Sequence, residues 1–357
     1  MSLHRRGRRC VTAALSSVLL LAGAGLTACG AGSSAAAAGD GGGDLPTVTI
    51  GKAVDTIGFS AVDVAQQMGY FKDAGVNVKT TLLHGSSQAA AALQGGSIQF
   101  ATLSSTSLLL AASQGVKLQA VTSLDYGVSV QIVTTKDWAN KQGITPTGSL
   151  AQRMKGLEGA KDAAISSTGT SVLKLMMQQN GADPGKVDFV TVGSDAAGSA
   201  ALGHGTLQVF VGSPPSSYYM ADQANSVIIA NATEVPAMKE MAYDILITDP
   251  SWASSNAKAA TAVATALARA ENLMATDPDK VIALEQKHFP SYSKDELMQS
   301  LKQVQWTKNG TFTQPMWDDA VTVSQQMGQL KGSVDTRENG LWTNKYIDTA
   351  KTAPGSN

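Results

Sequence analysis

Short apolar segments alternate with helical patterns along most of the chain, and this alternation restricts the folds available to it. Residues 48–50 alternate as a strand, residues 61–68 carry apolar side chains at helical spacing, and a second alternating segment follows at 76–82. Further strands are predicted at 98–103, 118–124, 129–135, 162–165, 187–192, 207–212 and 226–230, and further helices at 86–96, 106–114, 171–180, 196–203 and 216–224. Because strand–helix–strand units connect parallel neighbours through right-handed crossovers, we expect an α/β protein built on doubly wound parallel sheets.

Two blocks of these units are joined near residues 136–160 and again near 235–250, which predicts two lobes. After Ser254 the pattern is helical, with helices predicted at 256–276, 278–288, 293–304, 316–329 and 344–350. The expected division is a first lobe of residues 46–136 plus 243–357 and a second lobe of residues 137–242. Ligands of such sheets bind at the carboxyl ends of the strands, where the helices begin.

The first residues have the pattern of a bacterial export signal. Arg5, Arg6, Arg8 and Arg9 precede an apolar run at 11–21 that is too short to span a bilayer, and Leu26-Thr-Ala-Cys29 resembles a lipobox. We expect a lipoprotein signal peptide at 1–28, a lipid on Cys29, and a flexible Gly/Ala/Ser tether at 29–45. The body would then be extracytoplasmic and anchored to the outer face of the cell membrane; the alternative is an ordinary signal peptide with an incidental cysteine.

The composition of the mature chain excludes several functions. Removal of the four arginines leaves 23 basic against 28 acidic side chains, a net charge of −5, which argues against nucleic acid as a partner. The two cysteines, Cys10 and Cys29, both precede the body. The body therefore offers no disulfide, thiolate nucleophile or cysteine-based metal site.

Small hydroxyl residues follow several predicted strands, where helix amino termini offer unpaired N–H groups to an anion. The stretch Ser166-Ser-Thr-Gly-Thr-Ser171 is the longest example, in which Gly169 would allow a ligand close to the backbone. The candidate hydroxyl groups in these turns are those of Thr56, Ser86, Ser87, Ser104, Ser105, Thr106, Thr168, Thr170, Ser171 and Ser213. The alternative is that these residues only cap their helices, because Ser and Thr are the preferred N-caps of any helix.

Aromatic residues near predicted strand ends complete the candidate site. Phe59, Tyr126 and Trp252 could cover the organic part of a ligand, and the alternative for each is packing in the core or between the lobes. His84, His204 and His288 show no metal-ligand spacing, so we expect neither a metal nor a cofactor.

Two segments of the first block carry a family resemblance. VAQQMGYFKDAGVNVKTT (64–81) and AALQGGSIQFATLSSTSLLLAASQGVKLQAVTS (91–123) resemble the substrate-binding proteins of ABC importers for aliphatic sulfonates, taurine, nitrate and thiamine-pyrimidine precursors. The resemblance implies a two-lobed type II periplasmic-binding fold and a monomeric, non-enzymatic receptor that delivers its ligand to permease subunits. The chain departs from the family in having Gln99 in place of Asp, and no proline in the turn after that strand.

The arginine positions help to choose a ligand class. Arg153, Arg269 and Arg337 all lie outside the candidate turns, so the carboxylate clamp expected of an α-amino acid receptor is missing. A small organic anion, such as a sulfonate or taurine, fits hydroxyl groups and helix termini better, and a stacked pyrimidine or nitrate remains an alternative. Polyamines are disfavoured because the turns carry little acid.

The sequence also leaves two alternatives to an importer receptor. Ser171-Val-Leu-Lys174 matches the S-x-x-K of penicillin-interacting enzymes and Ser254-Ser-Asn256 matches S-x-N, but the third element of that set is missing from the chain. A receptor that signals through a sensor kinase, rather than delivering its ligand, is a further alternative.

Overall fold

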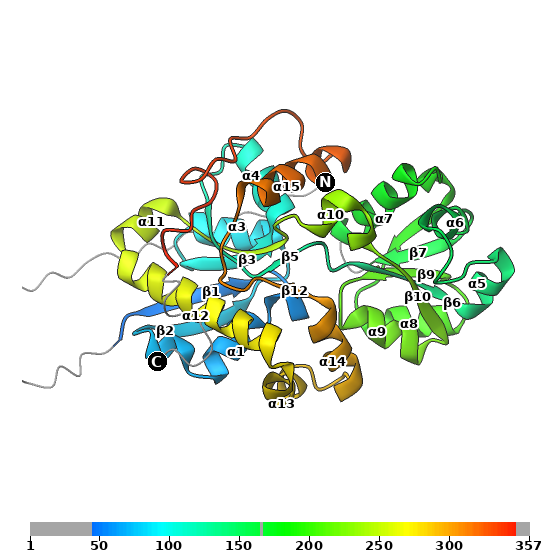
Figure 1. Cartoon of the computed structure of the whole chain (residues 1–357). Helices are drawn as coiled ribbons and strands as arrows, with labels where there is room; N and C mark the ends of the chain where they lie inside the picture. Colours follow the sequence, from blue (N-terminus) through cyan, green and yellow to red (C-terminus); the bar gives the residue numbers. More distant parts are fainter. Residues whose placement is uncertain (1–44, 165–166, 348–357) are drawn as a thin grey trace, which may run out of the picture. The chain divides into compact units, whose positions relative to one another are not determined.

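The computed structural model describes residues 45–164 and 167–347 (Figure 1). The expected signal peptide, Cys29 and nearly all of the tether therefore lie outside the described residues. Two five-stranded sheets organise the described chain. No helix in these two ranges is both long enough and apolar enough to cross a bilayer.

The first sheet has the strand order β2-β1-β3-β11-β4. Its strands are β1 (Thr47–Lys52), β2 (Asn77–Leu82), β3 (Phe100–Ser104), β4 (Gln119–Ser123) and β11 (Asp244–Thr248). β1 is parallel to both β2 and β3, whereas β11 is antiparallel to both of its neighbours. The expected parallel arrangement is therefore wrong for one central strand, and the sheet is mixed.

The second sheet has the order β10-β6-β9-β7-β8. Its strands are β6 (Gln131–Thr135), β7 (Lys161–Ala164), β8 (Asp188–Thr191), β9 (Val209–Gly212) and β10 (Ser226–Asn231). β6 is antiparallel to β9 and β10, and the other pairs are parallel. β6 thus belongs to the second sheet, although the predicted lobe division assigns residues up to 136 to the first lobe.

The antiparallel strand of each sheet is the one that arrives from the other sheet. The chain leaves the first sheet after β4 and enters the second as β6, and it returns after β10 as β11. The two crossing segments are hydrogen-bonded to each other, from Gly127 N to Met241 O (2.8 Å) and from Val128 N to Met238 O (2.8 Å). The outgoing segment also contains β5 (Asp125–Tyr126), which pairs with β12 (Gln305–Trp306).

Helices cover both faces of each sheet (Figure 1). Those around the first sheet are η1 (Ile57–Phe59), α1 (Ala61–Gln67), α2 (Tyr70–Asp73), α3 (Ser86–Gln94), α4 (Ser105–Ser113), α11 (Pro250–Ser255), α12 (Ala257–Thr276), α13 (Pro278–His288), α14 (Lys294–Gln303) and α15 (Gln314–Gln326). Those around the second sheet are α5 (Lys136–Gln142), α6 (Leu150–Lys155), α7 (Ser167–Gln179), η2 (Pro184–Lys186), α8 (Asp195–Gly203), α9 (Ser216–Gln223), η3 (Ala232–Glu234) and α10 (Pro236–Lys239).

The core consists of apolar layers between sheets and helices. One layer joins the first sheet to α1 and the alanine-rich α12, with Ile50, Phe100 and Val263 fully buried. Another lies between the second sheet and α8 and α9, around Phe210 and Met220. Small side chains on α12 let the helix approach the sheet closely, so the burial of apolar surface there is dense.

Two of the predicted helices differ from the structure in where they begin or in whether they form, and the predicted junctions also contain helices, among them α5 and α6. α7 begins at Ser167, four residues before the predicted start, so most of the hydroxyl-rich stretch belongs to the helix rather than to a turn. The predicted helix at 344–350 is not formed over its described part, because residues 344–347 make a turn around the hydrogen bond from Ile347 N to Asn344 O. The remainder of that predicted helix lies outside the described residues.

Candidate functional site

The ends of β1, β3 and β4 and the start of β11 meet at one edge of the first sheet, called here the carboxyl edge. Four side chains form a hydroxyl cluster there: Ser86, Ser104, Thr106 and Ser107. Ser104 Oγ lies 3.1 Å from Thr106 Oγ1 and 2.9 Å from Ser107 Oγ, and Ser107 Oγ donates to Ser86 Oγ at 3.2 Å. The structure thus brings together three predicted residues from two turns and adds Ser107.

The two helices that begin at this cluster differ in how their termini are capped. Ser104 Oγ accepts from Ser107 N at 3.3 Å and so caps α4. The N-cap of α3 is Gly85, and no side chain caps that helix. The first turn of α3 therefore lies next to the hydroxyl cluster, in which Ser107 Oγ already donates to Ser86 Oγ.

Two aspartates, the carboxyl pair, lie beside the hydroxyl cluster. Asp244 is the register partner of Ser104 across β11 and β3, and Asp125 Oδ1 accepts from Asp244 N at 2.8 Å. Burial raises the pKa of Asp244 to about 7 and, together with the charge of Asp244, raises the pKa of Asp125 well above its usual range. A buried acid pair of this kind at a sheet edge is a candidate for a functional site.

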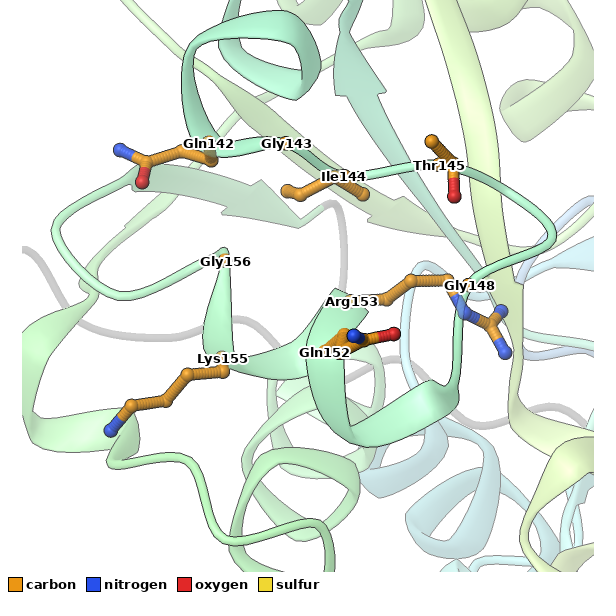
Figure 2. A pocket seen from close by; sticks show the side chains of 9 residues that line it. All are labelled: Gln142, Gly143, Ile144, Thr145, Gly148, Gln152, Arg153, Lys155 and Gly156. Atoms are coloured by element: carbon orange, nitrogen blue, oxygen red, sulfur yellow. The ribbon is translucent and has the colours of Figure 1, made fainter.

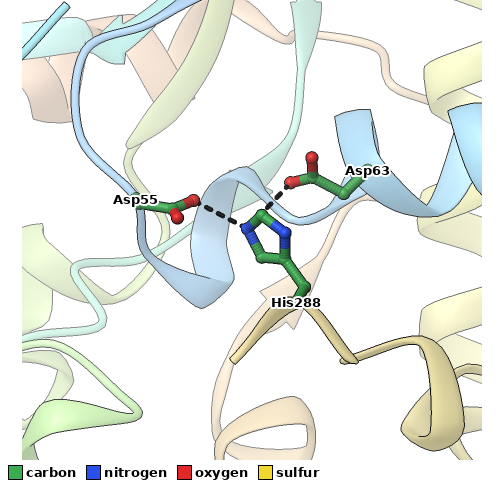
Figure 3. Close-up of side chains that lie close together, drawn as sticks. All are labelled: Asp55, Asp63 and His288. Atoms are coloured by element: carbon green, nitrogen blue, oxygen red, sulfur yellow. Dashed lines mark hydrogen bonds and ion pairs between the residues drawn. The ribbon is translucent and has the colours of Figure 1, made fainter. Parts of the chain in front are cut away.

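A second group of charges, the lysine cluster, lies at the end of β1 and consists of Lys52, Asp55, Asp63 and His288. Figure 3 shows the last three of these side chains. Lys52 Nζ lies 2.6 Å from Asp55 Oδ1 and 2.7 Å from Asp63 Oδ2. His288 Nε2 lies 2.9 Å from Asp55 Oδ1 and 3.3 Å from Lys52 Nζ. The hydrogen bond to Asp55 raises the pKa of His288. Burial alone would raise the pKa of Asp55, but its contacts with His288 and Lys52 outweigh burial and lower the pKa to about 2.

The donor atoms of Asp55, Asp63 and His288 lie close enough together to hold a metal ion. The lysine ammonium already contacts both carboxylates, so the protein supplies the cation itself. The place of His288 in this cluster could not be predicted from the sequence, because 225 or more positions separate it from its partners. The sequence feature that could have indicated the lysine cluster is Lys52, a charged residue at the end of an apolar strand.

In the second sheet, the elements that carry predicted site residues are the start of α7 and the turn after β9. Thr168 and Thr170 are half-buried in the first turn of α7. Gly169 is buried instead, and an added Cβ would lie 3.3 Å from Val211 Cγ1 and from Val211 O. The expectation that Gly169 admits a ligand to the backbone is therefore corrected: the missing Cβ lets α7 approach β9. Ser213 hydrogen-bonds the buried Tyr243, next to the carboxyl pair.

The start of α8 is filled by the protein's own side chains. Asp195, its first residue, accepts hydrogen bonds from Ser216 Oγ (2.7 Å) and from the Tyr292 hydroxyl. Tyr292, between α13 and α14, also lies edge-on to Tyr219 with ring centroids 5.6 Å apart. These contacts connect elements of the two sheets and leave little room for an anion at α8.

Other predicted residues have different surroundings. Trp252 follows β11, whose end pairs with the start of β3, so it lies at the opposite edge and contacts Phe100 at 5.2 Å. Phe59 is 3 % exposed in the core, and the buried Ser105 hydroxyl donates to Ala242 O. The remaining candidates stay at strand ends: Thr56 is half-buried beside η1, Ser87 is exposed on α3, and Tyr126 lies in β5.

The serine–lysine pair of the enzyme alternative is engaged elsewhere. Ser171 Oγ accepts a long hydrogen bond from Gln329 Nε2 (3.4 Å). The Lys174 ammonium lies over the Phe189 ring, 4.5 Å from its centroid. A lysine held on an aromatic face is poorly placed to activate a serine.

A cavity of about 490 Å³ lies between α5 and α6 and is lined by Gln142, Gly143, Ile144, Thr145, Gly148, Gln152, Arg153, Lys155 and Gly156 (Figure 2). α5 follows Thr135, which pairs with Ser226 at the start of β10, so the cavity lies toward the amino edge of the sheet. Its buried arginine, Arg153, is already paired with Glu234. The carboxyl edge, with its hydroxyl and carboxyl groups, is the better candidate site.

Two mixed five-stranded sheets, each completed by a strand that crosses from the other, define the type II periplasmic-binding-protein fold. This confirms the fold class expected from the sequence. The chain belongs to the NMT1/THI5-like family, which matches residues 57–281.

Solved structures agree with this fold. The periplasmic aliphatic sulphonate-binding protein SsuA of Escherichia coli is 16% identical, with 85% of this chain and 99% of that chain covered and a TM-score of 0.66. The periplasmic nitrate-binding protein NrtA of Synechocystis PCC 6803 is 16% identical (82% and 84% covered, TM-score 0.63). A zinc-bound ligand-binding component of an ABC-type import system from Staphylococcus aureus is 14% identical (84% and 98% covered, TM-score 0.68). A search of curated protein sequences gave no match.

Proposed function

We propose that the chain is the extracytoplasmic receptor of an ABC importer and that it captures a small organic anion of the sulfonate type at the carboxyl edges of its two sheets. Family membership and the structural neighbours, which include sulfonate- and nitrate-binding proteins, support this class. The protein is anchored to the membrane by a lipid on Cys29. It is a non-enzymatic monomer and passes its ligand to permease subunits.

The observation that carries the proposal is the hydroxyl cluster beside the uncapped start of α3. Hydroxyl and backbone N–H donors hold an anion without an arginine, and a hydrogen bond to a charged group contributes roughly 1.5–3 kcal/mol. Four such bonds, less the cost of association, reach about −8 kcal/mol, which is on the order of micromolar affinity. Closure of the two sheets on the ligand would add donors from α7 and Ser213.

Calorimetric titration of the mature protein with ethanesulfonate, nitrate and an aminopyrimidine tests the ligand class. We expect ethanesulfonate to bind, and Ser86→Ala to weaken that binding by about tenfold through loss of one hydrogen bond to a charged group. Ser86 is the position to change because it caps no helix. Ser113→Ala, at the other end of α4, is the matched control. If only the pyrimidine or only nitrate binds, that compound and not a sulfonate represents the ligand class of this protein.

A further inference from the structure

We infer that Tyr292 holds the two sheets together around the candidate site, and that its bond to Asp195 raises the affinity for a ligand that Tyr292 itself does not contact. The group formed by Tyr292, Asp195 and Ser216 is called here the latch. Tyr292 is therefore a positioning residue. The inference rests on the proposed function for its ligand, whereas the effect of the latch on the two sheets can be measured without a ligand.

The latch is a hydrogen-bonded contact between elements of different sheets. Tyr292 lies between α13 and α14 and packs against the apolar layer of the first sheet. Its hydroxyl donates to Oδ2 of Asp195, the first residue of α8, and the same oxygen accepts from Ser216 Oγ at 2.7 Å. Burial and the charge of Asp195 raise the pKa of Tyr292, so the phenol keeps its proton and remains the donor. Hydrogen bonds to a carboxylate are stronger than those between neutral groups.

The latch joins two apolar layers that form separate clusters among the described residues, one around α12 and one around α8 and α9. Tyr219 packs against the second layer, and its ring lies edge-on to that of Tyr292. On the other face of each sheet, one apolar layer continues from Leu103 of β3 through Met238 of α10 to Val209 of β9. The sheets thus share a core on that face, so we expect them to separate on the face that carries the latch.

The latch also lies at the edges that face the ligand. Asp195 and Ser216 begin the helices that follow β8 and β9, so both lie at the carboxyl edge of the second sheet. Tyr292 follows α13, whose last residue, His288, belongs to the lysine cluster at the carboxyl edge of the first sheet. Ring contacts continue from His288 through Phe289 to Tyr292, with centroids 4.5 and 6.0 Å apart. A bond between these two edges therefore favours the arrangement in which both contact one ligand.

The latch changes the affinity through the population of that arrangement. A ligand that contacts both edges binds only when they are close together, so its apparent Kd rises as the closed arrangement becomes less populated. Tyr292→Phe keeps the ring and removes the hydroxyl. The loss of one hydrogen bond to a charged group should then weaken binding by about tenfold.

Calorimetric titration with ethanesulfonate tests the latch in the mature wild-type protein, in Tyr292→Phe, in Asp195→Ala and in the double variant. We expect each single substitution to weaken binding by about tenfold, and the double variant to bind hardly more weakly, because both changes remove the same bond. Tyr346→Phe is the matched control, because among the described residues the hydroxyl of the buried Tyr346 has no hydrogen-bond partner. This control should bind ethanesulfonate as the wild type does.

Small-angle scattering of the same proteins without ligand tests the latch independently of the ligand class. The radius of gyration should be larger in Tyr292→Phe than in the wild type, and unchanged in Tyr346→Phe. An unchanged radius or an unchanged ethanesulfonate affinity in Tyr292→Phe, or additive losses of affinity in the double variant, overturns the inference and leaves the sulfonate receptor standing. Failure of every sulfonate to bind overturns the proposed function instead, and the scattering comparison then decides whether the latch holds the sheets together.

Discussion

Two groups of acidic residues lie at the same edge of the first sheet but have different electrostatic surroundings. In the lysine cluster, two aspartates share Lys52 and contact His288. In the carboxyl pair, Asp125 and Asp244 face each other and the backbone of Gly58. The first group contains its own basic partners, Lys52 and His288, whereas burial raises the pKa values of both carboxyl groups of the second.

The difference separates a structural role from a binding role. The lysine cluster links the turn after β1 to the end of α13, because the nearly buried Lys52 contacts both aspartates and His288. The carboxyl pair is instead a candidate for a functional role, because raised carboxyl pKa values are concentrated at functional sites. Three changes test whether this division holds, beginning with the largest expected effect.

Replacement of Lys52 by methionine should strongly reduce the stability of the protein. Lys52 is 5 % exposed, and its loss leaves His288 as the one remaining basic contact described for Asp55 and Asp63, which is expected to cost about 2–4 kcal/mol in the free energy of unfolding. Urea denaturation measures this loss. Lys155→Met removes an exposed pair with Glu158 and should cost far less. Equal effects of the two substitutions would contradict a structural role for the cluster.

Replacement of Gly58 by alanine should break the carboxyl pair rather than the fold. The new Cβ collides with Asp244 Oδ2, so Asp244 must move. Because Asp244 is the register partner of Ser104 in the hydroxyl cluster, we expect affinity for ethanesulfonate to fall by about tenfold, as for one lost hydrogen bond to a charged group. The control is Gly203→Ala, because no atom lies within 4 Å of an added Cβ there. An unchanged affinity in Gly58→Ala would mean that the carboxyl pair is not part of the ligand site.

The smallest effect should be a pH dependence of ethanesulfonate binding. The pKa of Asp244 is raised by burial to about 7, so the carboxyl is mostly ionised at pH 8 and mostly protonated at pH 6. Ionisation of Asp244 places a negative charge beside the bound anion, so the affinity for ethanesulfonate should fall by about threefold as the pH rises through 7. The groups that face Asp244 are Asp125, Glu271 and Tyr243, whose pKa values are all raised well above their usual ranges.

Asp244→Asn provides the reference in that experiment. It carries no carboxyl group at this position, so its affinity should lack this pH dependence. Titration of His288, whose pKa is also raised, would affect both proteins alike and cancels in the ratio of their affinities. A ratio that is independent of pH would mean that Asp244 does not interact with the bound anion.

Most helices and strands follow from local pattern, but one central strand does not. β11 (DILIT) falls in the predicted junction near 235–250, because a strand buried on both faces lacks the alternation that marks a half-exposed strand. Apolar spacing also does not show from which sheet a strand arrives, so it does not predict strand direction. The predicted strand at 129–135, which contains β6, is therefore antiparallel to neighbours to which it was expected to be parallel.

The candidate site could likewise be predicted only in part from the sequence. Hydroxyl residues after β2 and β3 are visible in the sequence, and the structure brings Ser86, Ser104 and Thr106 together. Asp125 and Asp244 are single acids at the ends of apolar strands, and their pairing depends on two segments 119 residues apart. A sequence also cannot show whether a glycine such as Gly169 admits a ligand or a neighbouring strand, because both uses need only the absence of a side chain.

The hydrogen-bonded crossing segments have a mechanical consequence. Two chains joined at Gly127–Met241 and Val128–Met238 form a narrow ribbon, which flexes easily across its flat face and resists stretching and sliding. We therefore expect relative motion of the sheets to be rotation about one line rather than free tumbling. The carboxyl pair lies at the end of that ribbon, so a change in its charge would act on the pivot itself.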